Sequence, residues 1–426
     1  MKIIQLIKSA FYQLRSQRLL TWVSISGTAL AIFLIMIVVM LQQVKTAPFA
    51  PESNRDRLLH YKMTSVQIIS KQGMYNGPLS YEFIKECIEP LESAETFTLF
   101  SFMNESKIIS DFGGKSISAD VRRTDHRFWK VFDFTFINGK PFSEDDFNTA
   151  SATAVISESV ANSLFGTTDV TGRDLTVNGK PYRVTGVVKD VSQLASTAYA
   201  QVWCNVSREG LSSGFKYWGE LSAVILAKSP ENREEVRSEL LRRIEELNKI
   251  YKAEDMEVIL HQRPYTQEVD ALNTFCNEDP DLEKARRTRY MVYLILLIVP
   301  AINLLSMTQS RLRQRMSEIA IRRAFGRQRS SIILDILFEN LLLTLIAGLI
   351  GLVLSVAFAY VFDSYVFAQR SFYAIETSAS FKELFHWSTF GLALLFCFVL
   401  NVLSNSIPAW KASRTSLTGA LSGREK

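Results

Sequence analysis

The sequence predicts a membrane α-helical protein with four transmembrane helices and a large α+β domain outside the membrane. Three observations predict this fold class. Uncharged apolar runs at residues 19–41, 290–307 and 341–362 are each long enough to cross a hydrocarbon core of about 30 Å at about 1.5 Å per helical residue. Residues 42–289, between the first two runs, alternate between strand-like and helix-like patterns. An Arg-rich segment at residues 310–340 follows the second run.

The N-terminal residues 1–18 predict an amphipathic helix that lies along the inner membrane surface. A plain charged lead-in to the first span is the alternative. The run at 19–41 is longer than the signal-peptide core of about 7–15 residues, and no small-residue cleavage site precedes Gln42. We therefore expect an uncleaved anchor. The apolar side chains of the N-terminal helix recur at helical spacing, at Ile3, Leu6, Ile7, Ala10, Phe11 and Leu14.

The remaining spans are predicted at residues 290–307, 332–362 and 386–407, the last of which also contains Ser, Thr and Asn. Lys and Arg gather before the first span, in residues 308–331, and in the tail at 408–426. Because short basic segments stay in the cytoplasm, we expect both termini inside and residues 42–289 and 363–385 outside. The formal net charge of +5 therefore reflects topology, and nucleic acid is not an expected partner.

The external segment begins with a β-α-β pattern. Strand-like residues at 58–70 and 96–110 flank a helix that Ser80 caps and that runs to Leu91. The same order recurs near the end of the segment, and together the two units predict a split ferredoxin-like layer of sheet and helices.

The second unit has strand patterns at 220–227 and 257–262 around a helix at 230–251. Ser229 is the expected cap of this helix, with Pro230 at its first position. Residues 273–289 are polar and charged, which predicts a helical stalk back to the membrane. The expected buried stripe of the long helix is Val236, Leu240, Ile244, Leu247 and Tyr251.

The insert between the two units, residues 120–206, is mostly β in pattern. Alternating residues at 174–177 and 182–188 are joined by Asn178-Gly179, a strong hairpin signal. A short helix at 157–165 is expected to end at Gly166.

Four aromatic residues lie close together in the insert. Packing in the core of a sheet is one interpretation, and an apolar groove for a lipid or a peptide is the other. The four residues are Phe128, Trp129, Phe132 and Phe134.

No motif for catalysis or metal binding stands out. Gly113-Gly114-Lys115-Ser116 resembles the end of a Walker A sequence, but Ile109 stands where that pattern needs glycine, so we expect a turn. The four histidines have no metal-ligand spacing and no GxSxG elbow marks a serine, although a Ser-His-Asp site can assemble from distant residues. Of the four cysteines, Cys87, Cys204 and Cys276 are external, where one disulfide or free thiols are both open alternatives.

The Arg-rich segment has seven arginines (311, 313, 315, 322, 323, 327 and 329) against one acid, Glu318, before the chain turns apolar again. We interpret it as a basic docking helix at the cytoplasmic face that ends at Gly326; an ordinary positive-inside loop is the alternative. Asp335 and Glu339 are expected at the inner membrane rim, within reach of arginines, because a charge at mid-bilayer costs about 2.5–3.5 kcal/mol. A proton relay is the alternative role for these acids. Helical spacing places Leu312, Met316, Ile319 and Ala320 on one face of the docking helix.

Several stretches resemble one permease family. Residues 317–326 (SEIAIRRAFG) resemble the REIGIRRALGA segment of the family that includes MacB, the LolC/LolE lipoprotein-releasing subunits and FtsX. Residues 407–413 (IPAWKAS) with Ala420-Leu421 resemble its closing PAxxAxxxxPxxAL pattern, with Leu417 where the second proline is expected. Residues 154–166 (AVISESVANSLFG) and 182–190 (YRVTGVVKD) are similar to its periplasmic core domain.

The resemblance implies the membrane subunit of a type VII ABC system in the bacterial inner membrane, which transmits motion rather than forming a channel. Its external domain would have a Porter lobe (residues 55–118 and 218–265), a Sabre lobe (119–210) and a stalk (266–289). Residues 308–331 would be the coupling helix, entering an apolar cleft of an ATPase with arginines at the rim. The expected ATPase contacts are Arg315, Met316, Glu318, Ile319, Ala320, Arg322, Arg323, Ala324, Phe325 and Gly326.

The resemblance also sets the expected partners. MacB carries its own N-terminal ATPase, whereas this chain starts directly at the membrane, so we expect a separate cytoplasmic ABC ATPase that binds ATP and Mg, and no cofactor in this chain. A second permease chain, identical or related, would complete a dimer in membrane lipid, and a periplasmic adaptor with an outer-membrane channel is an optional addition. The expected function is efflux or extraction of an antibiotic, a peptide or a lipoprotein. An FtsX-like regulator of cell-wall hydrolases and a membrane-anchored periplasmic enzyme are the alternatives.

Overall fold

The computed structural model describes residues 18–206, 216–314, 319–321 and 324–362, and beyond them the single residues 390, 391, 394, 395, 398, 399, 402, 406 and 410. The expected N-terminal amphipathic helix, the external loop at 363–385 and most of the fourth span and the tail lie outside the described residues. The chain divides into two compact units. We name them the membrane unit (residues 1–42, 283–361 and 384–426) and the external unit (43–282 and 362–383).

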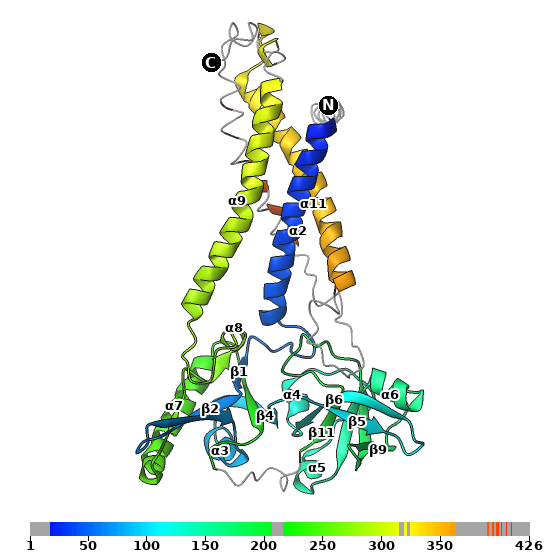
Figure 1. The fold of residues 1–426 in the computed structure, drawn as a ribbon, viewed down its shortest axis with the longest axis vertical. Helices are drawn as coiled ribbons and strands as arrows, with labels where there is room; N and C mark the ends of the chain where they lie inside the picture. Colours follow the sequence, from blue (N-terminus) through cyan, green and yellow to red (C-terminus); the bar gives the residue numbers. More distant parts are fainter. Residues whose placement is uncertain are drawn as a thin grey trace. The chain divides into compact units, whose positions relative to one another are not determined.

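Three long helices each contain one of the first three predicted spans (Figure 1). They are α2 (Arg18–Thr46), α9 (Leu282–Gln314) and α11 (Arg329–Phe362). In two of them, the stretches Thr21–Thr46 and Ser330–Ala359 are long and apolar enough to cross a membrane. Within the membrane unit, a Cβ added at Gly351 of α11 would lie 2.9 Å from the carbonyl oxygen of Ala29 in α2, so glycine permits the close approach of these helices. A total of four spans stays a prediction.

The external unit is built on an 11-stranded sheet whose order is β11-β8-β10-β9-β5-β6-β4-β12-β1-β14, with β7 paired to β10. A second sheet of three strands has the order β13-β2-β3. The strands of the large sheet are β1 (Leu58–Tyr61), β4 (Ala94–Ser101), β5 (Glu105–Ser110), β6 (Ser116–Thr124), β7 (Phe136–Gly139), β8 (Thr153–Ser157), β9 (Asp174–Val177), β10 (Lys180–Val188), β11 (Val202–Asn205), β12 (Leu221–Ala227) and β14 (Tyr265–Thr266). Those of the small sheet are β2 (Met63–Ile68), β3 (Gly73–Pro78) and β13 (Met256–Ile259).

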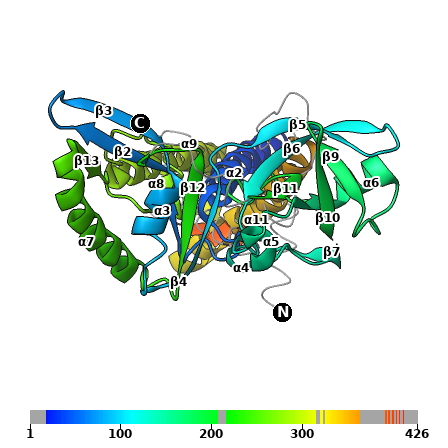
Figure 2. The same ribbon diagram turned by 90° about the horizontal axis from the view of Figure 1, so that it is seen from below.

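Strands of the two predicted β-α-β units pair with each other, but in two separate sheets instead of one layer. Strand β12 pairs with β4, and β13 pairs with β2. The helices of the units, α3 (Tyr81–Cys87) and α7 (Arg233–Tyr251), pack in one apolar core cluster, and α7 lies beside the three-stranded sheet (Figure 2). Four of the five residues of the predicted α7 stripe are buried, and Leu247 is partly buried against the same cluster.

Two predicted boundaries differ from the structure. Helix α7 begins three residues later than expected, with Asn232 as its N-cap, because residues 229–232 form a turn in which Ser229 Oγ donates to Asn232 Oδ1 (2.8 Å). The two long strand patterns at 58–70 and 96–110 are each split into two strands that belong to different pairings. The predicted α3 cap is confirmed, since Ser80 Oγ accepts from the amide of Phe83 (3.0 Å).

The local signals of the insert are confirmed. Asn178 and Gly179 both have positive φ (47° and 79°) in the turn between β9 and β10, as a type I′ hairpin requires. Helix α6 (Glu158–Phe165) has Ser157 as its N-cap and ends at Gly166 in the left-handed region. The short helices of the unit are α4 (Phe128–Val131), α5 (Glu144–Asn148), α8 (Gln267–Asp270) and the 3₁₀ turn Lys252–Glu254.

The proposed border between Porter and Sabre lobes, at residues 118/119, falls inside β6. Strand β6 joins β4 through the pair Phe100↔Thr124, and joins β5 through six pairs. The lobe division itself stays a prediction. Cys87, Cys204 and Cys276 are free thiols, which decides between the two alternatives left open for the described cysteines.

Candidate functional site: a buried joint at the end of helix α2

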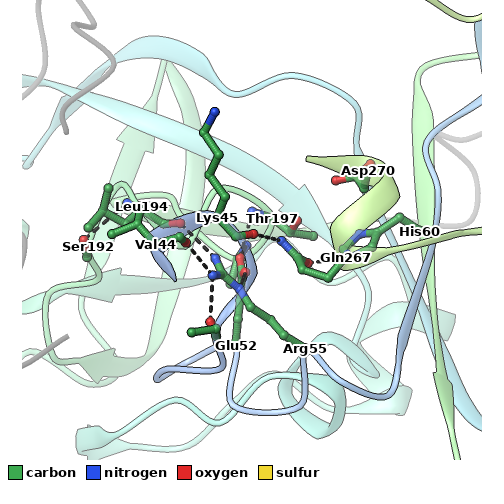
Figure 3. A network of polar contacts seen from close by, with 12 residues as sticks. Val44, Lys45, Glu52, Arg55, His60, Ser192, Leu194, Thr197, Gln267 and Asp270 are labelled. Atoms are coloured by element: carbon green, nitrogen blue, oxygen red, sulfur yellow. Dashed lines mark hydrogen bonds and ion pairs between the residues drawn. The ribbon is translucent and has the colours of Figure 1, made fainter. Parts of the chain in front are cut away.

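The last turn of α2, residues 43–46, belongs to the external unit, whereas the rest of the helix belongs to the membrane unit. The end of any α-helix leaves backbone carbonyls without partners inside the helix. Here the carbonyls of Val44, Lys45 and Ala47 accept hydrogen bonds from side chains of the external unit (Figure 3). We name these contacts the α2 joint; its side chains are Arg55, Glu52 and Gln267.

Arg55 is the centre of the joint, and its side chain is almost completely buried. Its Nη1 donates to the carbonyls of Val44 (2.7 Å) and Ala47 (2.9 Å), and its Nη2 donates to the carbonyl of Leu194 (2.9 Å). Its Nε donates to Glu52 Oε2 (2.7 Å). One guanidinium therefore links the end of α2 to a loop of the insert, about 140 residues further along the chain.

Glu52 is fully buried and completes the link from the other side. Its Oε1 accepts from two consecutive backbone amides, those of Thr197 and Ala198 (both 2.8 Å). A buried carboxylate needs such partners, because removal from water costs several kcal/mol. Glu52 thus uses one oxygen for Arg55 and the other for the same loop that Arg55 holds.

In the loop at residues 192–198, between β10 and β11, most side chains are small, and Ser192, Ala195, Thr197 and Ala198 are buried whereas Ser196 is exposed. Arg122 of β6 donates to the carbonyls of Thr197 and Ser196. Burial lowers the pKa of Arg122 to about 10, although the Glu52 carboxylate opposes this effect, so the guanidinium stays charged at neutral pH. Trp203 Nε1 of β11 donates to the carbonyl of Ala198 (3.1 Å). The loop is therefore bonded to the sheet as well as to the joint.

Gln267, at the start of α8, forms a second arm of the joint. Its Nε2 donates to the carbonyl of Lys45 (2.9 Å), and its Oε1 lies 2.8 Å from His60 Nε2 on β1. Because the amide nitrogen of Gln267 is a donor, its oxygen must accept, which places the proton of His60 on Nε2. The side chain of Lys45 extends away from the network (Figure 3).

Two titratable groups support this arm. Burial lowers the pKa of His60 below its ordinary 6.5, although the carboxylate of Asp270 opposes the effect, so the ring is neutral at pH 7. Burial alone would raise the pKa of Asp270, but the ammonium of Lys62, whose Nζ lies 2.6 Å from Asp270 Oδ2, and His60 hold it below 3.8. At pH 7 His60 is therefore uncharged, whereas Lys62 and Asp270 form an ion pair.

Arg55 with Glu52 is the first arm of the joint and Gln267 is the second. They connect to different parts of the external unit but bind the same kind of group. Both bind main-chain carbonyls of the end of α2. In an α-helix each residue turns by about 100° around the axis, so the carbonyls of Val44 and Lys45 lie on different sides of it. Holding both sides resists rotation of the helix end as well as movement along the axis.

The predicted docking helix is described only in part. Arg315, Met316, Glu318, Arg322 and Arg323 lie outside the described residues. Ile319 and Ala320 are buried within the membrane unit, and Ile319 packs with Ile332 and Ile336 of α11. Two side chains of the predicted apolar face are therefore covered by the chain itself, and the contact with an ATPase stays a prediction.

The exposed side chains of that segment are different ones. Ala324 and Gly326 are exposed, Ile321 is half-exposed, and Phe325 has 88% of its surface exposed. Gly326 has a φ of 84°, which explains why glycine ends the helix there.

The two acids of the third predicted span are within α11. Asp335 Oδ2 lies 2.6 Å from Arg327 Nη2, so the expected pairing with an arginine is observed for this acid. Glu339 is buried within the membrane unit.

The four aromatic residues of the insert come together in one cluster. The ring of Trp129 contacts Phe134, Phe142 and Trp203 at centroid distances of 4.9, 5.4 and 6.0 Å. Phe128 and Phe132 are fully buried, which is the pattern of a core, whereas Trp129 and Phe134 are partly buried against it. A ligand would reach the first two only if the cluster opened, and the apolar groove stays a prediction.

The α2 joint was not predicted from the sequence. Its residues are separated by up to 222 positions from their partners, and a glutamate and an arginine three residues apart are common on protein surfaces. The available signal was position, since Glu52 and Arg55 follow the end of the apolar span at residue 41 within about 15 residues. Burial of the pair depends on the fold of the distant loop and could not be inferred.

Comparison with known proteins matches most of the chain to two family models. The model described as MacB-like periplasmic core domain matches residues 21–243, and the model described as FtsX-like permease C-terminal matches residues 290–417. The first covers most of α2, the joint residues Glu52 and Arg55, and most of the external unit.

Similar proteins include an uncharacterized ABC transporter permease YknZ of Bacillus subtilis (strain 168), which is 19% identical over 426 residues and aligned over 99% of each chain. The macrolide export ATP-binding/permease protein MacB of Shewanella oneidensis (strain MR-1) is 25% identical over 329 residues, covering 74% of this chain and 45% of that protein. This chain thus spans less than half the length of the MacB relative. The crystal structure of the periplasmic region of MacB from Actinobacillus actinomycetemcomitans aligns with 51% of this chain and 95% of that one, at 17% identity and a TM-score of 0.34.

Proposed function

The chain belongs to the family of ABC transporter permeases with a MacB-like periplasmic core domain and an FtsX-like C-terminal region, and we propose that it passes ATP-driven motion from a separate cytoplasmic ATPase to its external unit. In this proposal ATP and Mg would bind on that partner. A second permease chain, identical or related, would complete a dimer in the cytoplasmic membrane.

The observation that carries this proposal is the α2 joint. A helix that merely anchors a domain can end in a flexible linker, but this one ends in three carbonyls bonded to buried side chains of the external unit. The end of α2 is therefore fixed inside the external unit, and we propose that this fixed end is where a displacement of the helix reaches that unit. That property suits a permease that works by transmitting motion.

We place the ATPase contact in the segment around residues 319–326. Phe325 and Ile321 supply exposed apolar surface there, while the buried Ile319 braces the segment against α11. Large apolar side chains in water mark a contact surface, and arginines at 322, 323 and 327 would form its polar rim. The apolar cleft on the partner would receive Phe325.

The test is co-purification of the full chain with its ABC ATPase from membranes. We expect Phe325→Glu to lower the recovered ATPase by at least about tenfold, because burying a charge in an apolar contact costs more than about 1.4 kcal/mol. Phe112→Glu is the matched control, since Phe112 has 71% of its surface exposed and lies in the external turn between β5 and β6. Equal recovery with both variants would refute the contact.

The transported substrate is proposed at the level of class. The relatives include proteins named for export of macrolides and of pyoverdine, and we propose efflux or extraction of a substrate at the external face. A periplasmic adaptor and an outer-membrane channel are optional partners of such a process. Deletion of the chain should raise sensitivity to at least one member of a panel of macrolides and antimicrobial peptides, and an unchanged panel would count against efflux of these classes.

A further inference from the structure

We propose that Arg55 and Glu52 make the loop at residues 192–198 the point where α2 acts on the external unit, so that without the pair ATP-driven motion stops at the joint. This inference rests on the proposed function and deepens it by naming the residues and the receiving segment. Arg55 and Glu52 are positioning residues in this proposal, since neither is expected to touch nucleotide or substrate.

The composition of the joint is the first argument. A buried ion pair contributes little net stability, because desolvation offsets its attraction, and apolar residues of similar volume often stabilise a fold as well. What apolar residues cannot do is bind main-chain carbonyls. Three of the four hydrogen bonds of Arg55 go to carbonyls, two at the end of α2 and one at Leu194. The pair therefore supplies a directional connection between two backbones.

The receiving loop is the second argument. Thr197 is held through its amide by Glu52 and through its carbonyl by Arg122, and Ala198 is held through its amide by Glu52 and through its carbonyl by Trp203. A loop bonded on both sides of consecutive peptides moves as a body. Movement of the end of α2 would thus be passed to β6, which carries Arg122, and to β11, which carries Trp203.

The far end of this path is the aromatic cluster. The indole of Trp203 lies 5.2 Å from the ring of Phe134 and 6.0 Å from that of Trp129, between ring centroids. Both partners are partly buried against the core of the cluster. We expect a shift of the loop at 192–198 to displace first the partly buried rings at the solvent border of the cluster.

The experiment uses the full chain in complex with its co-purified ABC ATPase in lipid nanodiscs, with and without ATP and vanadate, and measures amide hydrogen exchange. The variant is Glu52→Gln with Arg55→Met, which keeps an acceptor for the amides of the loop and the volume of the arginine stem while removing the bonds to α2. The matched control is Arg57→Met with Glu95→Gln; Arg57 also pairs with a glutamate and binds the carbonyls of Ala227 and Lys228, but does not contact α2.

In the wild type and the control, vanadate trapping should change exchange at residues 192–203 by at least about fivefold, the lower end of typical coupling between sites. In the joint variant this change should disappear, while the change at residues 319–326 remains. A nucleotide response at 192–203 that persists in the joint variant would overturn the proposal. No response at 319–326 in the wild type would instead refute the proposed ATPase contact, so the two failures are distinguishable.

Discussion

Replacement of Arg55 by methionine tests the energetic weight of the joint. The substitution keeps most of the apolar stem but removes every hydrogen bond of the guanidinium. Glu52 is then left as a buried carboxylate without its counter-ion, and the carbonyls of Val44, Ala47 and Leu194 lose their donor. Because both side chains are at most 1% exposed, water cannot replace these contacts without opening the structure.

The expected magnitude follows from that burial. Breaking a buried ion pair by removing one partner typically costs about 3–5 kcal/mol. For a unit of this size each kcal/mol lowers the melting temperature by about 2–4 °C, so the external unit should melt roughly 6–20 °C lower. Adding Glu52→Gln removes the orphaned charge, and the double variant should be destabilised less than the sum of the single variants by at least about 1 kcal/mol.

The assay is thermal unfolding of the full chain in detergent, followed by tryptophan fluorescence, since Trp129, Trp203 and Trp218 all lie in the external unit. Arg57→Met is the control: the Arg57 side chain is 23% exposed and that of its partner Glu95 is 48% exposed. An ion pair of that exposure is worth about 0–1 kcal/mol. If Arg55→Met melts within a few degrees of the control, the joint is not a buried connection and the reasoning is wrong.

Three further predictions test other parts of the external unit. Because the pKa of His60 is lowered in the fold, the unfolded state binds more protons than the folded state below pH 6.5, and the stability present above pH 6.5 should be lost as pH falls, by at most about 1.4 kcal/mol per pH unit. The melting temperature of His60→Asn should depend less on pH. Equal melting temperatures of the wild type at pH 5.5 and pH 7 would contradict this prediction. Gly139→Ala should cost more than Gly166→Ala in denaturant melts, since both have positive φ but a Cβ at Gly139 would lie 2.2 Å from a backbone oxygen and one at Gly166 meets nothing within 4 Å; equal costs would refute this steric reasoning. In a Cys397→Ser background, maleimide should modify the half-buried Cys276 before Cys204, whose pKa burial raises to about 12, and mass mapping that finds the reverse order would disprove the assigned burial.

Features that depend on a few neighbouring residues could be predicted from the sequence. Asn178-Gly179 needs only positive φ at two positions to form its turn, and Ser80 needs only the amide three residues later to cap α3. The cap of α7 was placed wrongly because Ser229 and Asn232 are both good capping residues, and their mutual hydrogen bond decides between them. Either residue could cap the helix, and the structure uses Asn232, the later of the two.

Features that depend on what a surface packs against could not be predicted. The periodicity that put Ile319 on an apolar face was correct, but an apolar face does not specify its partner, and Ile332 and Ile336 of the same chain occupy it. Phe325 lay outside that periodicity and is the exposed side chain. The burial of Glu52 and Arg55 could not be predicted for the same reason, because it requires a loop more than 135 residues further along the chain.

The chemistry of the joint implies an uneven tolerance to substitution along the chain. Arg55 and Gln267 bind backbone oxygens of residues 44, 45 and 47, which every amino acid supplies in the same place as long as the helix end keeps its geometry. Lys45, whose side chain extends away from the network, can therefore vary while its carbonyl keeps the bond to Gln267. The binding side chains have no such freedom, because a guanidinium that reaches three carbonyls and a carboxylate at once has no substitute among the other residues. In the hydrogen bonds of Arg55 and Gln267, specificity thus lies in the binding side chains, and residues 44, 45 and 47 contribute backbone oxygens.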